Sequence, residues 1–118
     1  MGHDDDRSEL VRGTLDLLVL RVLAQGPLHG YAIASRIRAR SGDVLHVEEG
    51  SLYPALHRLE RRGAVDASWG RSESNRRARF YRLTPRGRRE LRDEGAAWRR
   101  VSDAVARVLG PAPDPEPA

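Results

Sequence analysis

Residues 50–63, GSLYPALHRLERRG, combine a leucine stripe with an unusual set of polar side chains. Leu52, Leu56 and Leu59 recur at helical spacing and predict an amphipathic helix over residues 49–62. The other side of this helix carries hydroxyl, imidazole and guanidinium groups, which can donate to or accept from base edges in a DNA major groove. An ordinary solvated face with a half-buried tyrosine is the alternative. The residues expected on this side are Ser51, Tyr53, Pro54, His57, Arg58 and Arg61.

A second basic group follows in RRARFYRL, residues 76–83. Arg76, Arg77 and Arg79 lie at or near the tip of a predicted hairpin, where guanidinium groups could bind the phosphates of a nucleic-acid backbone. Such contacts add affinity that depends on salt and little on base sequence. Glu73 in the tip would repel phosphate, so the tip itself is not expected to enter a minor groove. A solvated run of charge is the alternative.

A third polar group lies on the helix predicted over residues 29–41. Tyr31 is close to the N-terminus of this helix, where backbone N–H groups can bind a phosphate. Ser35 and Arg36 lie farther along and could reach the same backbone. Packing of Tyr31 in the core is the alternative.

The charge distribution favours a polyanionic partner. The chain has 118 residues and a net charge of +4, and all 21 basic residues are arginine. Twelve of these arginines lie between Arg58 and Arg92, where only four carboxylates accompany them. A basic middle between acidic ends is typical of nucleic-acid binding. The alternative, a genome that prefers arginine codons, explains the absence of lysine but not this distribution.

Several other classes of protein are disfavoured. No apolar run reaches the length of a membrane span, and no secretory signal precedes the first helix, so a cytoplasmic protein is expected. The chain has no cysteine, which excludes disulfides and thiolate metal sites. Its four histidines form no HExxH pair, and no phosphate-binding glycine loop occurs. We therefore expect neither an enzyme nor a protein with a metal or cofactor.

The pattern of elements indicates a mainly α fold with a small β-hairpin, a winged helix-turn-helix followed by a C-terminal helix. Helices are predicted over residues 8–25, 29–41 and 49–62, and a short extended piece over residues 44–47. Strands follow at 64–69 and 76–83, and Thr84-Pro85 starts a last helix that reaches residue 109. Residues 8–83 would form the DNA-binding domain and 84–109 a dimerisation helix, with disordered tails at 1–7 and 110–118.

Two helices carry more apolar surface than one small domain needs. The first helix is apolar on two sides, so one side could be covered by a partner subunit. The last helix has apolar residues at coiled-coil-like intervals. The residues expected at a homodimer interface are Leu15, Val19, Leu91, Trp98, Val101, Val105 and Val108.

Four segments together resemble the PadR family of winged-helix transcriptional regulators. They are GTLDLLVLRVL (13–23), GPLHGYAIASRI (26–37), EGSLYPALHRLERRG (49–63) and RRARFYRLTPRG (76–87), in the family's order. The single C-terminal helix is similar to that of the smaller PadR subfamily. The resemblance implies a homodimer that binds double-stranded operator DNA, usually as a repressor, and that a small-molecule effector or stress signal releases in some members.

The resemblance also gives Trp98 a candidate role, because an aromatic residue in this helix can stack flat ligands between the subunits of ligand-responsive relatives. A tryptophan that only packs the dimer core is the alternative. Two other functions stay open: a winged-helix adaptor that binds a protein, and a small-molecule sensor with DNA binding as its output.

Overall fold

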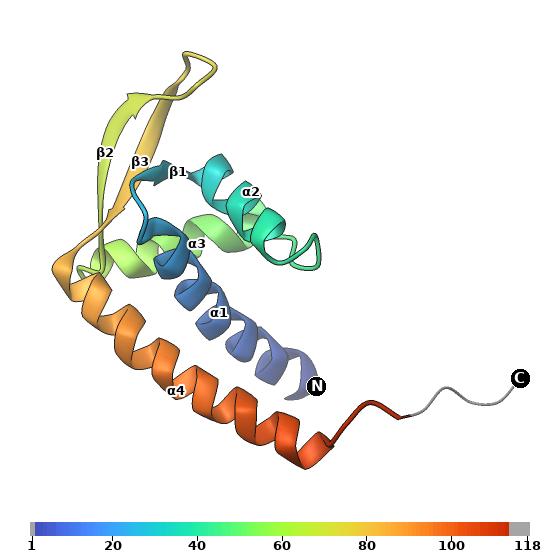
Figure 1. The fold of residues 1–118 in the computed structure, drawn as a ribbon. Helices are drawn as coiled ribbons and strands as arrows, with labels where there is room; N and C mark the ends of the chain where they lie inside the picture. The colour runs from blue at the N-terminus through green and yellow to red at the C-terminus, as the bar shows by residue number, and fades with distance from the viewer. Residues whose placement is uncertain (1, 114–118) are drawn as a thin grey trace, which may run out of the picture.

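The computed structural model describes residues 2–113, with side chains from residue 13 onward. Its elements follow the predicted order, with one short strand in an unexpected place (Figure 1). They are α1 (Gly2–Leu23), β1 (Leu28–His29), α2 (Gly30–Arg40), α3 (Glu49–Arg61), β2 (Val65–Arg71), β3 (Arg77–Leu83) and α4 (Pro85–Leu109).

The strands form one antiparallel sheet in the order β1-β3-β2. The hairpin register places Val65 opposite Leu83, and β1 adds Leu28 opposite Tyr81 on the other edge of β3. The predicted fold class, a winged helix-turn-helix followed by a long helix, is confirmed. The extended piece expected at 44–47 is wrong, because those residues form a loop and the additional strand precedes α2. A two-residue strand leaves no alternation for a sequence pattern to reveal.

The ends of the chain differ from the expectation. Helix α1 begins at Gly2 and not at residue 8, so residues 2–7 are helical instead of a disordered tail. Helix α4 ends at Leu109, and residues 110–113 follow without helical structure. Met1 and residues 114–118, the remainder of the predicted tails, lie outside the described residues.

Helix α1 lies between α4 on one side and α2 and α3 on the other (Figure 1). Its two apolar sides are therefore both covered by the same chain. Leu15 and Val19 are only 6% and 0% exposed in the hydrophobic core. The expectation that these two residues face a partner subunit is wrong, because the chain's own helices already bury them.

Helix α4 starts where the hairpin returns to the core. Thr84 caps it: its Oγ1 accepts from Gly87 N at 3.0 Å and donates to Gly63 O at 2.6 Å. Pro85 occupies the first turn, as the sequence predicted. Gly87 is buried against the Ala64 backbone, and a Cβ at residue 87 would lie only 2.1 Å from Ala64 O. These contacts fix the base of α4 to the end of α3 and the start of β2.

Candidate nucleic-acid interface

Helix α3 separates its leucines from its polar side chains as the sequence predicted. Leu52, Leu56 and Leu59 are buried in the core, together with Ala55. The helix continues through Pro54 without a break. Proline at this position removes a bond to the carbonyl of Gly50, which is in an exposed part of the first turn. The exposed residues on the predicted polar side are Ser51, Tyr53, Pro54, His57 and Arg61.

Arg58 does not share this outward direction. Its Nη2 donates to Asp16 Oδ1 of α1 at 2.8 Å, and its Nε donates to Oδ2 at 3.4 Å. The structure therefore corrects the expectation that Arg58 faces outward with its neighbours. Asp16 is 42 residues away in the sequence, so no local pattern indicated this pair.

The N-terminus of α2 lines one side of a surface hollow beside the exposed face of α3. Tyr31 is 80% exposed there, so it is not a core residue, and Ser35 and Arg36 are exposed farther along α2. The hydroxyl of Tyr53 lies against Gly30, where a Cβ would come within 3.0 Å of it. Glycine at the start of α2 thus lets the α3 tyrosine fit between the two helices.

His29, just before α2, has a structural role. Its Nδ1 accepts from Ala32 N at 3.3 Å and caps the helix. Its ring also meets Phe80 of β3 edge to face, with the centroids 5.4 Å apart. Both contacts tie the start of α2 to the sheet, so the position of Tyr31 depends on the hairpin.

The hairpin forms the other side of the same hollow, which Tyr31, Tyr53 and His57 share with Arg76, Arg77 and Arg79. The three arginines differ in their partners. Arg76 and Arg77 are exposed and make no ion pair with a described carboxylate. Arg79 Nη2 instead bonds Glu60 Oε2 of α3 at 2.9 Å. This bond holds the hairpin against α3 and leaves Arg79 less charge to offer a ligand than its two neighbours have.

Trp69 on β2 is a surface residue that the sequence interpretation did not single out. It is 62% exposed and lines the same hollow. The Cζ of Arg77 lies over its ring, 4.5 Å from the centroid, which fits a cation–π contact. The signal in the sequence was an aromatic residue in the strand that precedes an arginine-rich strand. This contact holds the Arg77 guanidinium above the face of the Trp69 indole ring.

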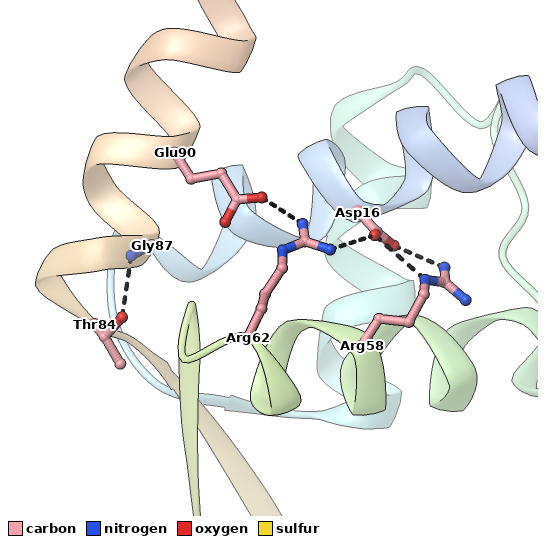
Figure 2. A network of polar contacts seen from close by, with 6 residues as sticks. All are labelled: Asp16, Arg58, Arg62, Thr84, Gly87 and Glu90. Carbon is pink, nitrogen blue, oxygen red and sulfur yellow. Dashed lines mark hydrogen bonds and ion pairs between the residues drawn. The ribbon is translucent and has the colours of Figure 1, made fainter.

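A second polar cluster lies at the C-terminal end of α3, where α3 meets α1 and α4 (Figure 2). Arg62, the residue that caps α3, bonds Asp16 of α1 and Glu90 of α4. Burial acts to lower the pKa of Arg62, but the bonds and charges of Glu90 and Asp16 outweigh it, and the net pKa is raised. The guanidinium therefore stays charged throughout the ordinary pH range.

The face of α4 that meets the core continues as an uncovered apolar face. Leu91 packs against the core cluster, whereas Trp98, Val101 and Val105 are 47%, 64% and 50% exposed. Val108 is almost fully exposed. Trp98 also borders a hollow between α1 and α4, together with Leu17, Leu20 and Glu94.

Neither a metal-binding cluster nor a membrane-spanning helix is found among the described residues. No group of three or more histidines and carboxylates gathers as a metal site in the described part of the chain. Among residues 2–113, no helix has the length and hydrophobicity that crossing a bilayer requires.

Comparison with known proteins agrees with this geometry. The transcriptional regulator PadR-like family model matches residues 19–93, more than half of the chain. A transcriptional regulator of Mycobacterium tuberculosis is 37% identical over 103 residues, which cover 86% of this chain and 89% of that protein. A transcriptional regulator structure from Clostridium thermocellum aligns with a TM-score of 0.77 and 27% identity, over 86% of this chain and 99% of that one. A PadR family regulator from Eggerthella lenta aligns with a TM-score of 0.68 and 36% identity, over 92% and 96%.

Proposed function

Because the chain belongs to the PadR-like family of transcriptional regulators, we propose that it is a homodimeric repressor that binds a pseudopalindromic operator. The observation that carries the proposal is the hollow in which the exposed face of α3 and the arginines of the hairpin meet. A helix with exposed polar groups suits the major groove, and a hairpin beside it suits the neighbouring backbone.

The exposed side chains divide into two groups by what they can contact. Tyr53, His57 and Arg61 lie on the outward face of α3 and would contact bases or the adjacent sugars, with Ser51 and Pro54 at its start. A second group would bind phosphates, because its members surround α3 and present hydroxyl or guanidinium groups. This group comprises Tyr31, Ser35, Arg36, Arg76 and Arg77.

Salt dependence tests the phosphate contacts. We would titrate the DNA upstream of the protein's own gene at increasing salt concentration and compare Arg77→Ala with Arg100→Ala, an exposed arginine of α4 opposite its apolar face. Arg77→Ala should weaken binding to every sequence and lower the slope of log K against log salt by about 0.9, the value of one phosphate contact. Arg100→Ala should leave the slope unchanged.

Base preference tests the α3 contacts. Arg61→Ala should reduce the preference for the operator over random DNA at specific base pairs, with a cost of about 1–3 kcal/mol where a bidentate contact is lost. A wild-type protein with no preference over random DNA would contradict the proposal. Capture of a stoichiometric protein partner without DNA enrichment would favour an adaptor instead.

The uncovered face of α4 supports the homodimer. Trp98, Val101, Val105 and Val108 continue the spacing of Leu91, and a second copy of the helix would bury them. Val101→Asp should give monomers at concentrations where the wild type sediments as a dimer, because it places an unpaired charge in the interface. Ala96→Asp, on the opposite exposed side of α4, is the matched control and should remain dimeric. A dimeric Val101→Asp protein would place the interface elsewhere.

The hollow beside Trp98 supports a small-molecule effector that releases the DNA. Its apolar wall and the carboxylate of Glu94 suit a planar cationic compound, because the Arg62 guanidinium in the same lining is already paired with Asp16 and Glu90. In a Trp69→Phe background, only Trp98 reports tryptophan fluorescence. Saturable quenching by such compounds, together with release from the operator, would support the site. An unchanged release response in Trp98→Ala would remove this residue from it.

A further inference from the structure

Three charged side chains join three helices at the C-terminal end of α3. Arg62 Nη1 donates to Asp16 Oδ2 of α1 at 3.3 Å, and its Nη2 lies 2.5 Å from Glu90 Oε1 of α4 (Figure 2). Asp16 is 8% exposed and also accepts the two bonds from Arg58. The fork of Arg62 thus connects the helix that carries the proposed DNA-reading face to the helix that carries the proposed dimer face.

The geometry of Arg62 suits orientation better than stability. A partly buried ion pair contributes little net stability, because desolvation of the charges offsets much of their attraction. In addition, the Arg62 Nε is buried and has no acceptor among the described residues. A planar guanidinium with two carboxylates on different helices nevertheless restricts the direction of both, because each bond requires its own arm of the fork.

The bonds of Arg62 to Asp16 and Glu90 form a clamp that holds α4 near its start. A small change in the angle of α4 at this clamp therefore produces a larger displacement at the far end of the helix. From Glu90 to Leu109, α4 extends 19 residues, which corresponds to about 29 Å of helix. A tilt of about 10° at the clamp would therefore displace the far end by about 5 Å. One base pair advances DNA by about 3.4 Å along its axis, so a displacement of this size along the DNA would change the separation of the two α3 helices by more than one base-pair step.

We propose that Arg62 is a positioning residue that clamps Asp16 to Glu90 and thereby sets the separation of the two α3 helices in the dimer. The clamp then determines which spacing of operator half-sites the protein accepts. This inference rests on the proposed function, since it needs a dimer joined through α4. Arg62 itself touches neither the DNA nor the partner in this proposal.

A distance measurement between the two DNA-binding domains tests the clamp directly. The chain has no cysteine, so Ala39→Cys, on the exposed surface of α2, provides one spin-label site in each protomer. The labelled dimer should give a single narrow distance distribution by pulsed electron paramagnetic resonance. Adding Arg62→Met should shift or broaden that distribution by about 5 Å, the displacement expected from the lever. Arg89→Met, an exposed arginine on the same helix as Glu90, is the control and should change nothing.

A second variant keeps the test decisive if Arg62→Met does not fold. Glu90→Gln keeps the shape of the side chain but removes the charge, and it should shift the distribution in the same sense. If Arg62→Met folds, the double variant should shift the distribution no further than Arg62→Met alone, because both changes break the same clamp.

The preference for half-site spacing is a second measurement, and it should stay unchanged if Arg62 only stabilises the fold. Duplexes with two half-sites at the best spacing, and one base pair longer or shorter, should be discriminated by the wild type. In both clamp variants this discrimination should fall several-fold, while affinity for a single half-site stays unchanged. A lower melting temperature with unchanged distances and unchanged spacing preference would overturn the positioning role. If the labelled protein without clamp substitutions gives no measurable distance between labels, the homodimer of the proposed function is wrong.

Discussion

Gly87 and Gly95 lie on the same helix, and alanine substitution should have opposite effects at the two positions. Both glycines weaken α4 intrinsically, since glycine is about 1 kcal/mol less favourable than alanine inside a helix. A Cβ added at Gly95 would have no atom within 4 Å, so Gly95→Ala should stabilise the protein by about 1 kcal/mol. At Gly87 the same atom would lie 2.1 Å from Ala64 O and 2.8 Å from Leu83 Cδ1.

The net effect at Gly87 follows from three contributions. Backbone cannot rotate away as a side chain can, so α4 must move off the Ala64 carbonyl, with an overpacking cost of about 1–3 kcal/mol. The movement also strains the bond in which Thr84 N donates to that carbonyl at 3.1 Å, which is worth about 1 kcal/mol. The helix-propensity gain of about 1 kcal/mol opposes both. Gly87→Ala should therefore destabilise the protein by about 1–3 kcal/mol.

Urea unfolding followed by far-ultraviolet circular dichroism measures both variants. The wild type, Gly87→Ala and Gly95→Ala must be compared at one protein concentration, because the stability of a dimer depends on it. A Gly87→Ala protein as stable as Gly95→Ala would show that α4 does not approach Ala64 as closely as the structure has it.

Three further outcomes are expected. Trp69→Ala should weaken DNA binding about two- to five-fold in a titration at fixed salt, because Arg77 loses a stack worth about 0.5–1 kcal/mol, whereas Trp69→Phe should retain most of the affinity. Burial raises the pKa of Tyr81, and the nearby Arg79 charge opposes this only in part. Tyr81 therefore contributes fully to the free energy of unfolding below a pH of about 10, where an unfolded tyrosine ionises, and this contribution is lost as the pH rises. Urea unfolding between pH 8 and 11 should therefore show a shallower loss for Tyr81→Phe. Asp16→Asn should cost about 1–3 kcal/mol in urea unfolding, since its arginine partners are only partly buried, while Asp66→Asn in an exposed pair should cost less than about 1 kcal/mol.

The sequence by itself determined the elements that local patterns encode. The stripe of Leu52, Leu56 and Leu59 specified which side of α3 is buried, because helical periodicity places these residues together. Thr84 and Pro85 specified the start of α4, because the cap and the first turn are satisfied by neighbours in sequence. The hairpin followed from a change in period on each side of a polar turn.

Tertiary structure alone decided which polar side chains, among those that helical spacing places at the surface, have no partner in the fold. The spacing of Arg58 in α3 predicts a surface position, yet its guanidinium donates to Asp16 on another helix. Leu15 and Val19 belong to a helix with two apolar sides, and periodicity cannot tell whether elements of the same chain or a partner subunit cover both sides. In each case the answer depends on a contact between residues far apart in the sequence.

The two glycines of α4 illustrate the same limit most simply. Gly87 and Gly95 have the same intrinsic helix propensity, because each loses the same backbone freedom when the helix forms. Packing distinguishes them, because the first lies against the Ala64 carbonyl and the second has open space beside it. The sequence determined that α4 would form, and the approach of α4 to the rest of the fold determined which of its glycines that fold requires.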